Sequence, residues 1–283
     1  MRHPATVLLA VLLTATPTAR ARAVETPGTE PEATVPTPAA AVILRVETEV
    51  FDGDDTDPVA RSLTLFQDGV AWDFLEPGAG DAARRTPAEI VLHDPSRGRI
   101  VVIDPERRVA TEIAAGRLER VESSLRAWAK GSDDALVRWS ASEDCQPRVE
   151  ADATVRLDGP GVGYRVVSGA APGVEAASRY GRFADTAVVL RALLHPGGLP
   201  PFPRLAINRH LADTGRLPET VTLELSGGAL RPTRVLRSEH RFAPRIGPED
   251  LDRIETASAA LAVAEKVDLD SYAKRVALAA TPH

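Results

Sequence analysis

Hydrophobic and polar residues alternate most regularly between residues 61 and 113, and this stretch predicts a run of β-strands. Its clearest unit is Leu63-Thr64-Leu65-Phe66-Gln67, then Asp68-Gly69, then Val70-Ala71-Trp72-Asp73-Phe74. Asp-Gly between two alternating runs is typical of a two-residue type I′ turn, because both turn positions need a positive φ. The sequence therefore predicts a tight β-hairpin here.

A two-residue turn fixes which side chains of the hairpin face one another. On one face the pattern predicts two apolar pairs, Leu65 with Trp72 and Leu63 with Phe74. On the other face it predicts the pair Thr64 and Asp73. Because side chains alternate between the faces of a strand, one side of the hairpin is apolar and the other is more polar.

Further strands extend this sheet in both directions along the chain. They are predicted over Val42–Val50, Ile90–Leu92, Ile100–Ile103 and Val109–Ile113. Asp94-Pro95 and Asp104-Pro105, ten residues apart, separate the last three. Pro presets φ at the second turn position and Asp caps the turn, so the matched spacing predicts a regular antiparallel meander. Both aspartates are interpreted as turn residues and not as catalytic carboxylates.

Beyond residue 115 helical and strand patterns alternate. Helices are predicted over 116–130, 133–139, 182–194, 200–215 and 248–261, with a last helix capped by Asp270. Strands are predicted over 149–157, 164–167, 220–226 and 229–236. The last two are predicted to meet across Gly227-Gly228, which places Leu225 opposite Leu230 and Glu224 opposite Arg231. Trp128 and Trp139, on the first two helices, are interpreted as core anchors.

Three of these helices carry an apolar stripe that can cover a sheet: Leu118–Trp128, Phe183–Leu194 and Leu251–Leu261. An antiparallel sheet with one apolar face must bury that face against another layer. The sequence therefore predicts an α+β fold in which helices cover the apolar face of an antiparallel β-sheet. Complete cover leaves a plain domain and incomplete cover leaves an apolar pocket, and the sequence leaves both open.

The N-terminus predicts export. Met1-Arg2-His3 is a short positive start, Val7–Ala15 is apolar, and Ala21-Arg22-Ala23 offers a cleavage site. The apolar run is shorter than the roughly 20 residues that span a bilayer, so residues 1–23 are interpreted as a signal peptide cleaved after Ala23. Residues 24–40 contain four prolines and no aromatic residue, which predicts a disordered linker. Residues 41–283 are then a single α+β domain.

Composition narrows the range of partners. Of 283 residues, 43% are hydrophobic and 26% are charged, which is typical of a folded globular domain. The formal net charge is -6, and it becomes more negative once the arginines of residues 1–23 are removed. An acidic chain without a Lys/Arg cluster argues against nucleic acid as a partner. No apolar segment is long enough to span a membrane.

No local motif predicts catalysis, a metal or a cofactor. His93, His195, His210 and His240 are far apart in the chain, and no G-x-S-x-G turn is present. Asp52–Pro58 is acidic but lacks the spacing of a calcium loop, so a solvated turn is the preferred interpretation. Cys145, the single cysteine, has no disulfide partner within the chain and is interpreted as a buried small residue.

The stretch Leu63–Ile113 contains a D-G hairpin, a W-D-F strand and the segments E-I-V-L-H-D-P and I-V-V-I-D-P-E-R-R. In this pattern it resembles the LolA/LolB-like periplasmic lipoprotein carriers. That resemblance implies a strongly curved sheet, an incomplete barrel, around an apolar cavity beneath helices. It also implies a periplasmic or secreted protein that binds a lipid or the acyl chain of a lipoprotein and is not an enzyme. The apolar face made by Leu63, Leu65, Trp72 and Phe74 is the predicted ligand-binding surface.

Two other function classes stay open at this point. The proline-rich linker and the lack of motifs also fit an envelope scaffold protein with no small ligand. A secreted hydrolase is the third class, because residues far apart in the sequence can converge in the fold. An enclosed apolar cavity separates the first class from the second, and a convergent His/Asp/Ser cluster in a cleft would favour the third.

Overall fold

The computed structural model describes residues 42–76, 87–226 and 233–279. These residues belong to one unit, Ala40–His283. The predicted signal peptide, residues 1–23, and the predicted linker, residues 24–40, lie outside the described residues. In the described part of the chain, no helix is long and apolar enough to cross a membrane.

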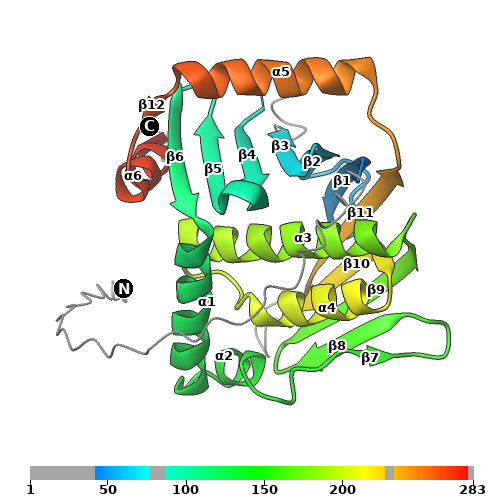
Figure 1. The fold of residues 1–283 in the computed structure, drawn as a ribbon. Coiled ribbons are helices and arrows are strands. Elements are labelled where there is room, and N and C mark those ends of the chain that lie inside the picture. Colours follow the sequence, from blue (N-terminus) through cyan, green and yellow to red (C-terminus); the bar gives the residue numbers. More distant parts are fainter. Residues whose placement is uncertain (1–41, 77–86, 227–232, 280–283) are drawn as a thin grey trace, which may run out of the picture. The chain divides into compact units, whose positions relative to one another are not determined.

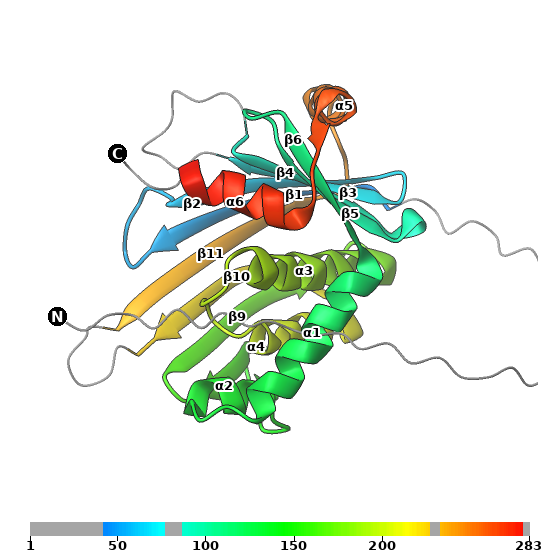
Figure 2. The same cartoon turned by 90° about the vertical axis from the view of Figure 1, so that its left-hand side faces the viewer.

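The described strands form one sheet that is strongly curved (Figures 1 and 2). In chain order they are β1 (Leu44–Asp52), β2 (Ala60–Gln67), β3 (Val70–Glu76), β4 (Glu89–Asp94), β5 (Arg99–Asp104), β6 (Val109–Ala114), β7 (Arg148–Val149), β8 (Val155–Gly159), β9 (Val162–Ala170), β10 (Arg216–Leu225), β11 (Arg234–Ala243) and β12 (Glu265–Lys266). Their order across the sheet is β12-β6-β5-β4-β3-β2-β1-β11-β10-β9-β8-β7. All neighbours pair antiparallel except β12, which pairs parallel with β6.

This order places β1 in the middle of the sheet. The chain runs outward from β1 to β6, crosses to the far edge, and returns inward from β7 to β11, which pairs with β1. Residues near the beginning and the end of the domain therefore lie on neighbouring central strands. The fold is an α+β fold with an open, curved antiparallel sheet, as the sequence predicts.

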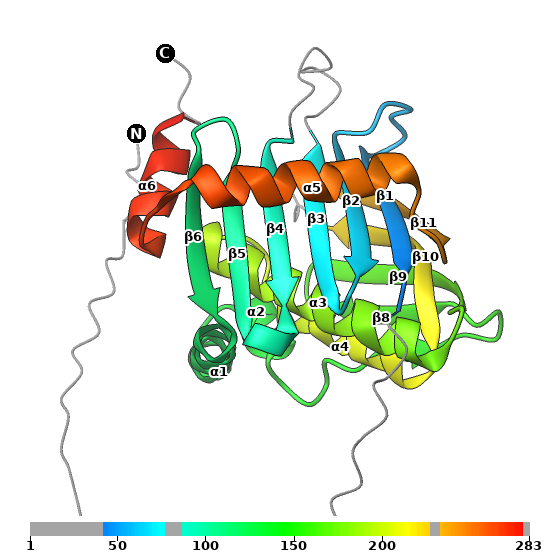
Figure 3. The same ribbon diagram turned by 45° about the horizontal axis from the view of Figure 1, so that its top comes forward.

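Helices lie on both faces of the sheet. They are α1 (Ala115–Lys130), α2 (Ala135–Ser140), α3 (Val174–Leu194), α4 (Phe202–Asp213), α5 (Pro248–Val263) and α6 (Leu269–Ala279). Figure 2 shows α3 and α4 on the concave face, and Figure 3 shows α5 crossing the strands on the opposite, convex face. The sheet is thus sandwiched between two helical layers of different extent.

The hairpin of β2 and β3 confirms the predicted register. Leu63 pairs with Phe74 and Leu65 pairs with Trp72. Asp68 and Gly69 have φ values of 50° and 81°, as a type I′ turn requires. On the other face Thr64 donates a 2.7 Å hydrogen bond to Asp73. Local turn chemistry was therefore sufficient to assign the face of each side chain.

The two Asp-Pro turns are also confirmed. The Asp94 carboxylate accepts hydrogen bonds from the Ser96 hydroxyl at 2.7 Å and from the Arg97 backbone N–H at 3.2 Å. The Asp104 carboxylate accepts one from the Arg107 backbone N–H at 2.9 Å. Each aspartate is buried and holds its turn, so neither is a free catalytic carboxylate.

The predicted strand over residues 149–157 is wrong in one respect. It is split into β7 and β8, which pair with each other as a hairpin. The Thr154 backbone N–H donates to the Asp152 carboxylate at 3.0 Å, and Ala153 adopts a φ of 62°. An Asp side chain that bonds the backbone two residues on makes a turn, and this interaction overrides the alternating pattern.

The predicted register of β10 and β11 is wrong as well. Leu225 pairs with Arg234 and Glu224 pairs with Val235, not with Leu230 and Arg231. The loop between the strands is therefore longer than the two glycines, and residues 227–232 lie outside the described residues. The register is set by β1, which pairs with β11 along its whole length, and not by the local turn.

Three smaller differences concern the helices. Helix α3 begins at Val174, eight residues before the predicted start. Helix α6 is capped by Asp268, whose carboxylate accepts a hydrogen bond from the Ser271 backbone N–H at 2.9 Å, and not by Asp270, which lies in its first turn. Trp128 is 62% exposed and so is not a core anchor, whereas Trp139 is half-buried against Gly159. Cys145 is buried, as predicted.

Candidate functional site

The convex face of the sheet contains the four apolar residues predicted to bind a ligand. Leu63, Leu65, Trp72 and Phe74 are each at most 6% exposed. They form one cluster with apolar residues of β4 to β6 and with Ile254, Ala257 and Leu261 of α5. The structure therefore brings all four together, and α5 covers them. Contact between these residues and a ligand stays a prediction, and it requires α5 to leave the sheet.

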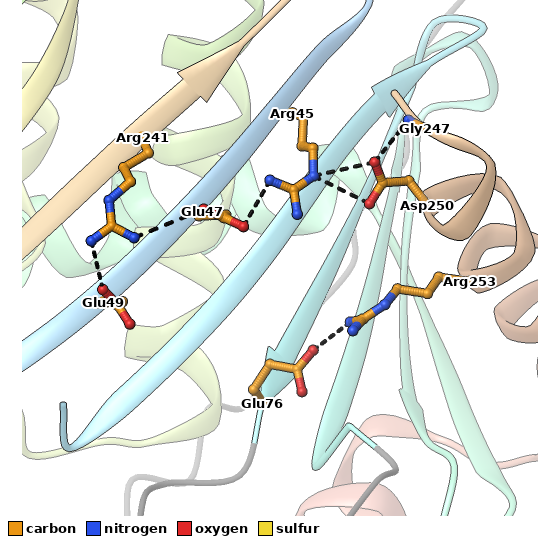
Figure 4. Close-up of polar contacts among 8 residues, drawn as sticks. All are labelled: Arg45, Glu47, Glu49, Glu76, Arg241, Gly247, Asp250 and Arg253. Atoms are coloured by element: carbon orange, nitrogen blue, oxygen red, sulfur yellow. Dashed lines mark hydrogen bonds and ion pairs between the residues drawn. The ribbon is translucent and has the colours of Figure 1, made fainter. Parts of the chain in front are cut away.

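Polar contacts hold the first half of α5 against the sheet (Figure 4). The Arg45 guanidinium of β1 lies 3.2 Å from the Asp250 carboxylate, which also accepts from the Gly247 backbone N–H at 2.9 Å. Arg253 reaches Glu76 of β3 at 2.6 Å. Because Asp250 caps its own helix and pairs with β1, α5 is fixed at the end where it enters the convex face.

The concave face differs because it is not fully filled. A hollow of about 230 Å³ lies between α3 and strands β1 to β4. Its apolar wall consists of Val50, Ala60, Leu75, Val91, Phe183, Ala187, Leu190 and Leu194. We name this space the α3 hollow. Phe183 and Leu190 are buried in helix α3, while Leu75 and Val91 are half-buried strand residues that face them.

Ionisable side chains lie among these apolar residues. Burial raises the pKa of Asp73 to about 6, against the lowering effect of its Thr64 hydrogen bond and of the Arg191 charge. Burial likewise raises the pKa of Glu89, opposed by Arg191 and by a hydrogen bond from Tyr272 at 3.3 Å. Asp73 still keeps part of its surface open to the hollow. Its desolvation therefore depends on what fills that space.

Arg191 is one of two arginines that line the α3 hollow, and the other, Arg61, is paired with Glu49 at 3.1 Å. Arg191 lies in the last turn of α3 and is exposed. Its guanidinium forms no hydrogen bond or ion pair at contact distance with another residue in the described ranges, although its charge acts on Asp73, Glu89 and His195. An exposed cation beside an apolar hollow is available to an anionic group that arrives from solvent.

A second, larger hollow lies further along the concave face. It has a volume of about 540 Å³ and is lined by Leu44, Gly169, Ala170, Pro172, Leu217, Glu219, His240, Phe242 and Pro244. We name it the β11 hollow. His240 lies in its wall, and the ring Nδ1 is 3.1 Å from the hydroxyl of Thr48, which lines the α3 hollow. The two hollows thus meet at the Thr48–His240 contact.

Catalytic and metal chemistry find little support in the described residues. No group of three or more His, Cys, Asp or Glu side chains there is arranged to hold a metal ion. Cys145 and His210 line a small polar depression beside α4, but burial raises the pKa of the Cys145 thiol to about 11. A thiol with that pKa is protonated at neutral pH and is a poor nucleophile.

The sequence did not single out Glu89, Arg191 or the polar wall at His240. The apolar alternation of β2 and β3 directed attention to the convex face, although Thr64 and Asp73 already marked the concave one. Two polar residues that face a helix-covered surface are unusual, because burying them costs free energy unless they are paired. That pair was the signal available in the sequence.

Comparison with known proteins adds little to this description. No protein-family model matches the chain, and no curated protein sequence does. Among solved structures, the crystal structure of a LolA-superfamily protein from Nitrosomonas europaea aligns at 9% identity, over 75% of this chain and 90% of that chain, with a TM-score of 0.27. A TM-score this low carries no argument. The fold class rests on the strand order, and membership of the LolA/LolB-like family stays a prediction.

Proposed function

We propose that this protein binds an apolar chain, such as the acyl chain of a lipid or of an acylated protein, on the concave face of its sheet and does not transform it. The observation that carries the proposal is the α3 hollow, an unfilled space with apolar walls and charged residues at its mouth. Binding sites for small amphipathic molecules combine these two features. On the convex face, by contrast, α5 packs against the apolar residues Leu63, Leu65, Trp72 and Phe74, which are each at most 6% exposed.

The size of the α3 hollow limits what it holds alone. An apolar cavity of about 150 Å³ accommodates benzene, so about 230 Å³ holds roughly nine carbon atoms by the same measure. Removing nine methylenes from water contributes about 7 kcal/mol of binding free energy. A micromolar complex needs a net binding free energy of roughly 8 kcal/mol, and the costs of association must be subtracted from the roughly 7 kcal/mol as well. A tightly bound chain therefore extends beyond the α3 hollow, and the β11 hollow lies next on the same face.

Export completes the proposal. The predicted signal peptide, residues 1–23, places the mature protein in the periplasm or outside the cell, where lipids and acylated proteins are available partners. N-terminal sequencing of the exported protein is expected to return Val24. A mature protein that begins at Met1 would contradict this part of the proposal.

The test uses a neutral ligand, so that it measures the apolar space alone. We expect the neutral fluorophore N-phenyl-1-naphthylamine to bind the purified protein saturably and to be displaced by 1-decanol. Ala187→Trp fills the α3 hollow from α3 and is expected to weaken binding at least tenfold. Ala259→Trp, on the exposed side of α5, is the matched control and should bind as the wild type does.

Folded protein that gives no saturable signal in this titration contradicts the proposal and favours the scaffold alternative. Equal binding by the wild type and by Ala187→Trp, confirmed as folded by circular dichroism, would place the ligand elsewhere than in the α3 hollow. Either result is obtained from the same set of proteins.

A further inference from the structure

Arg204 carries a buried nitrogen with no partner. It lies in the first turn of α4, which packs between α3 and strands β8 and β10. Its Nη1 atom is buried and forms no hydrogen bond in the part of the chain that the structure describes. Leaving a buried donor unpaired is unfavourable, and more so when the group is charged. An unpaired guanidinium therefore indicates that a partner is missing.

Asp185 of α3, an acid on which the charge of Arg204 acts, does not supply this partner. Its carboxylate accepts a hydrogen bond from Asn208 at 2.9 Å. Burial raises the pKa of Asp185 in spite of Asn208 and of the nearby arginines, so its charged form is not well stabilised there. Within the described residues no ion pair at contact distance joins Arg204 to an acid.

The other groups around Arg204 are neutral and able to donate hydrogen bonds. Tyr164 of β9 and Tyr180 of α3 are both 7% exposed, and neither hydroxyl forms a hydrogen bond with a described residue. Burial raises the pKa of each phenol, opposed by the charge of Arg204. Burial, and then Arg204, lowers the pKa of His240 to about 3, so this ring is uncharged. The ring nitrogens of His240 are occupied by the Thr48 and Ser238 hydroxyls, whereas Arg204 Nη1 and the two phenol hydroxyls can each donate to an anion.

The β11 hollow lies beside this cluster, although Arg204, Tyr164 and Tyr180 are not part of its wall. His240 belongs both to the surroundings of Arg204 and to the wall of the hollow, beside the apolar side chains of Leu44, Leu217 and Phe242. Tyr180 packs edge-on against Phe242, with ring centroids 5.3 Å apart. Glu219, the acid in the wall, is exposed. The apolar wall of the hollow therefore lies next to Tyr180 and contains His240, two groups on which the charge of Arg204 acts.

We propose that Arg204, with the hydroxyls of Tyr164 and Tyr180, binds the anionic group of an amphipathic ligand, a carboxylate or a phosphate, whose apolar chain occupies the β11 hollow. This rests on the proposed function and specifies its ligand as an anionic amphiphile. The guanidinium fork suits both oxyanions, because each presents two oxygens to its paired N–H groups.

Isothermal titration of the full-length mature protein tests this assignment with three probes of equal chain length: decanoate, decyl phosphate and 1-decanol. We expect one or both anions to bind the wild type at least tenfold tighter than the alcohol, and the tighter one identifies the head group. Arg204→Met keeps the apolar stem and should lower the anions to the affinity of the alcohol, while leaving the alcohol unchanged. Arg209→Met removes an exposed charge from the same helix and should have no effect.

If the anions bind Arg204→Met as tightly as they bind the wild type, the assignment of Arg204 is overturned. If 1-decanol still binds in that case, the proposed function itself is unaffected. If none of the three amphiphiles binds, the proposed function fails. The assignment of Arg204 as an anion site is then tested by measuring thermal midpoints with and without inorganic phosphate. A thermal midpoint that rises with phosphate in the wild type but not in Arg204→Met supports the Arg204 site. The same response in both proteins overturns it.

Discussion

The two faces of the sheet are built differently. On the convex face, Leu63, Leu65, Trp72 and Phe74 pack against α5 with almost no exposed surface. On the concave face, Asp73, Glu89 and Arg204 are at least partly buried among apolar residues, and two hollows remain. A filled apolar layer stabilises a fold, whereas partly buried ionisable groups beside empty space cost stability and are typical of binding sites. The convex face therefore stabilises the fold, and the concave face is where we propose that a ligand binds.

The largest expected effect is a loss of stability on the convex face. Phe74→Ala removes a fully buried ring and should lower the free energy of unfolding by about 3 to 5 kcal/mol. Val91→Ala, in the wall of the α3 hollow, should cost about 1 kcal/mol because its side chain is half-exposed. Guanidinium denaturation measures both. Equal losses would remove the distinction between the faces.

On the concave face, Asp73 should lower the free energy of unfolding in a pH-dependent way. Burial raises the pKa of Asp73 to about 6, above its ordinary value of 3.8, so the folded protein favours the neutral carboxyl. Stability from this group is therefore present below pH 4 and is lost as pH rises through 6. Asp73→Asn should be more stable than the wild type by roughly 3 kcal/mol at pH 8 and equal to it near pH 4.

Urea denaturation at both pH values measures this difference. Asp252→Asn, an exposed residue of α5, is the matched control and should show none. An Asp73→Asn protein that gains nothing at pH 8 would mean that water in the α3 hollow solvates the carboxylate fully.

A smaller effect concerns how α5 is held. Arg45→Met leaves the Asp250 carboxylate, whose side chain is 10% exposed, without its cation and should cost about 1 kcal/mol. Arg253→Met removes a more exposed ion pair, with side chains 48% and 27% exposed, and should cost at most about 0.5 kcal/mol. Hydrogen exchange of the α5 amides reports both. Greater deprotection by Arg253→Met would reverse the order of the two contacts.

For the fluorescence of Trp72 we expect no change when a ligand binds. In a protein with Trp128→Phe and Trp139→Phe, Trp72 is the sole fluorophore of its kind. Because α5 covers Trp72, its emission should not shift when an amphiphile fills the concave face. A saturable shift during titration with decanoate would instead show that the ligand reaches the convex face, as the sequence predicts for these residues.

Much of the local structure followed from the sequence. Asp68-Gly69 fixed the register of β2 and β3, and Asp94 and Asp104 fixed the turns of the meander, because a few adjacent residues contain all the interactions involved. The α+β class followed from the change of hydrophobic period along the chain. Where a local interaction competed with the pattern, as at Asp152, the pattern alone gave the wrong answer.

The candidate site was decided by tertiary structure. Leu63 and Trp72 form an apolar face in the sequence, but only the path of α5 determines that this face is closed. Arg204 comes within electrostatic reach of Tyr164, Tyr180 and His240 through four separate elements, α4, β9, α3 and β11, and no local spacing encodes that meeting. The physical reason is that period and turn chemistry act over a few residues, whereas the choice of which helix covers which face depends on the packing of the whole domain.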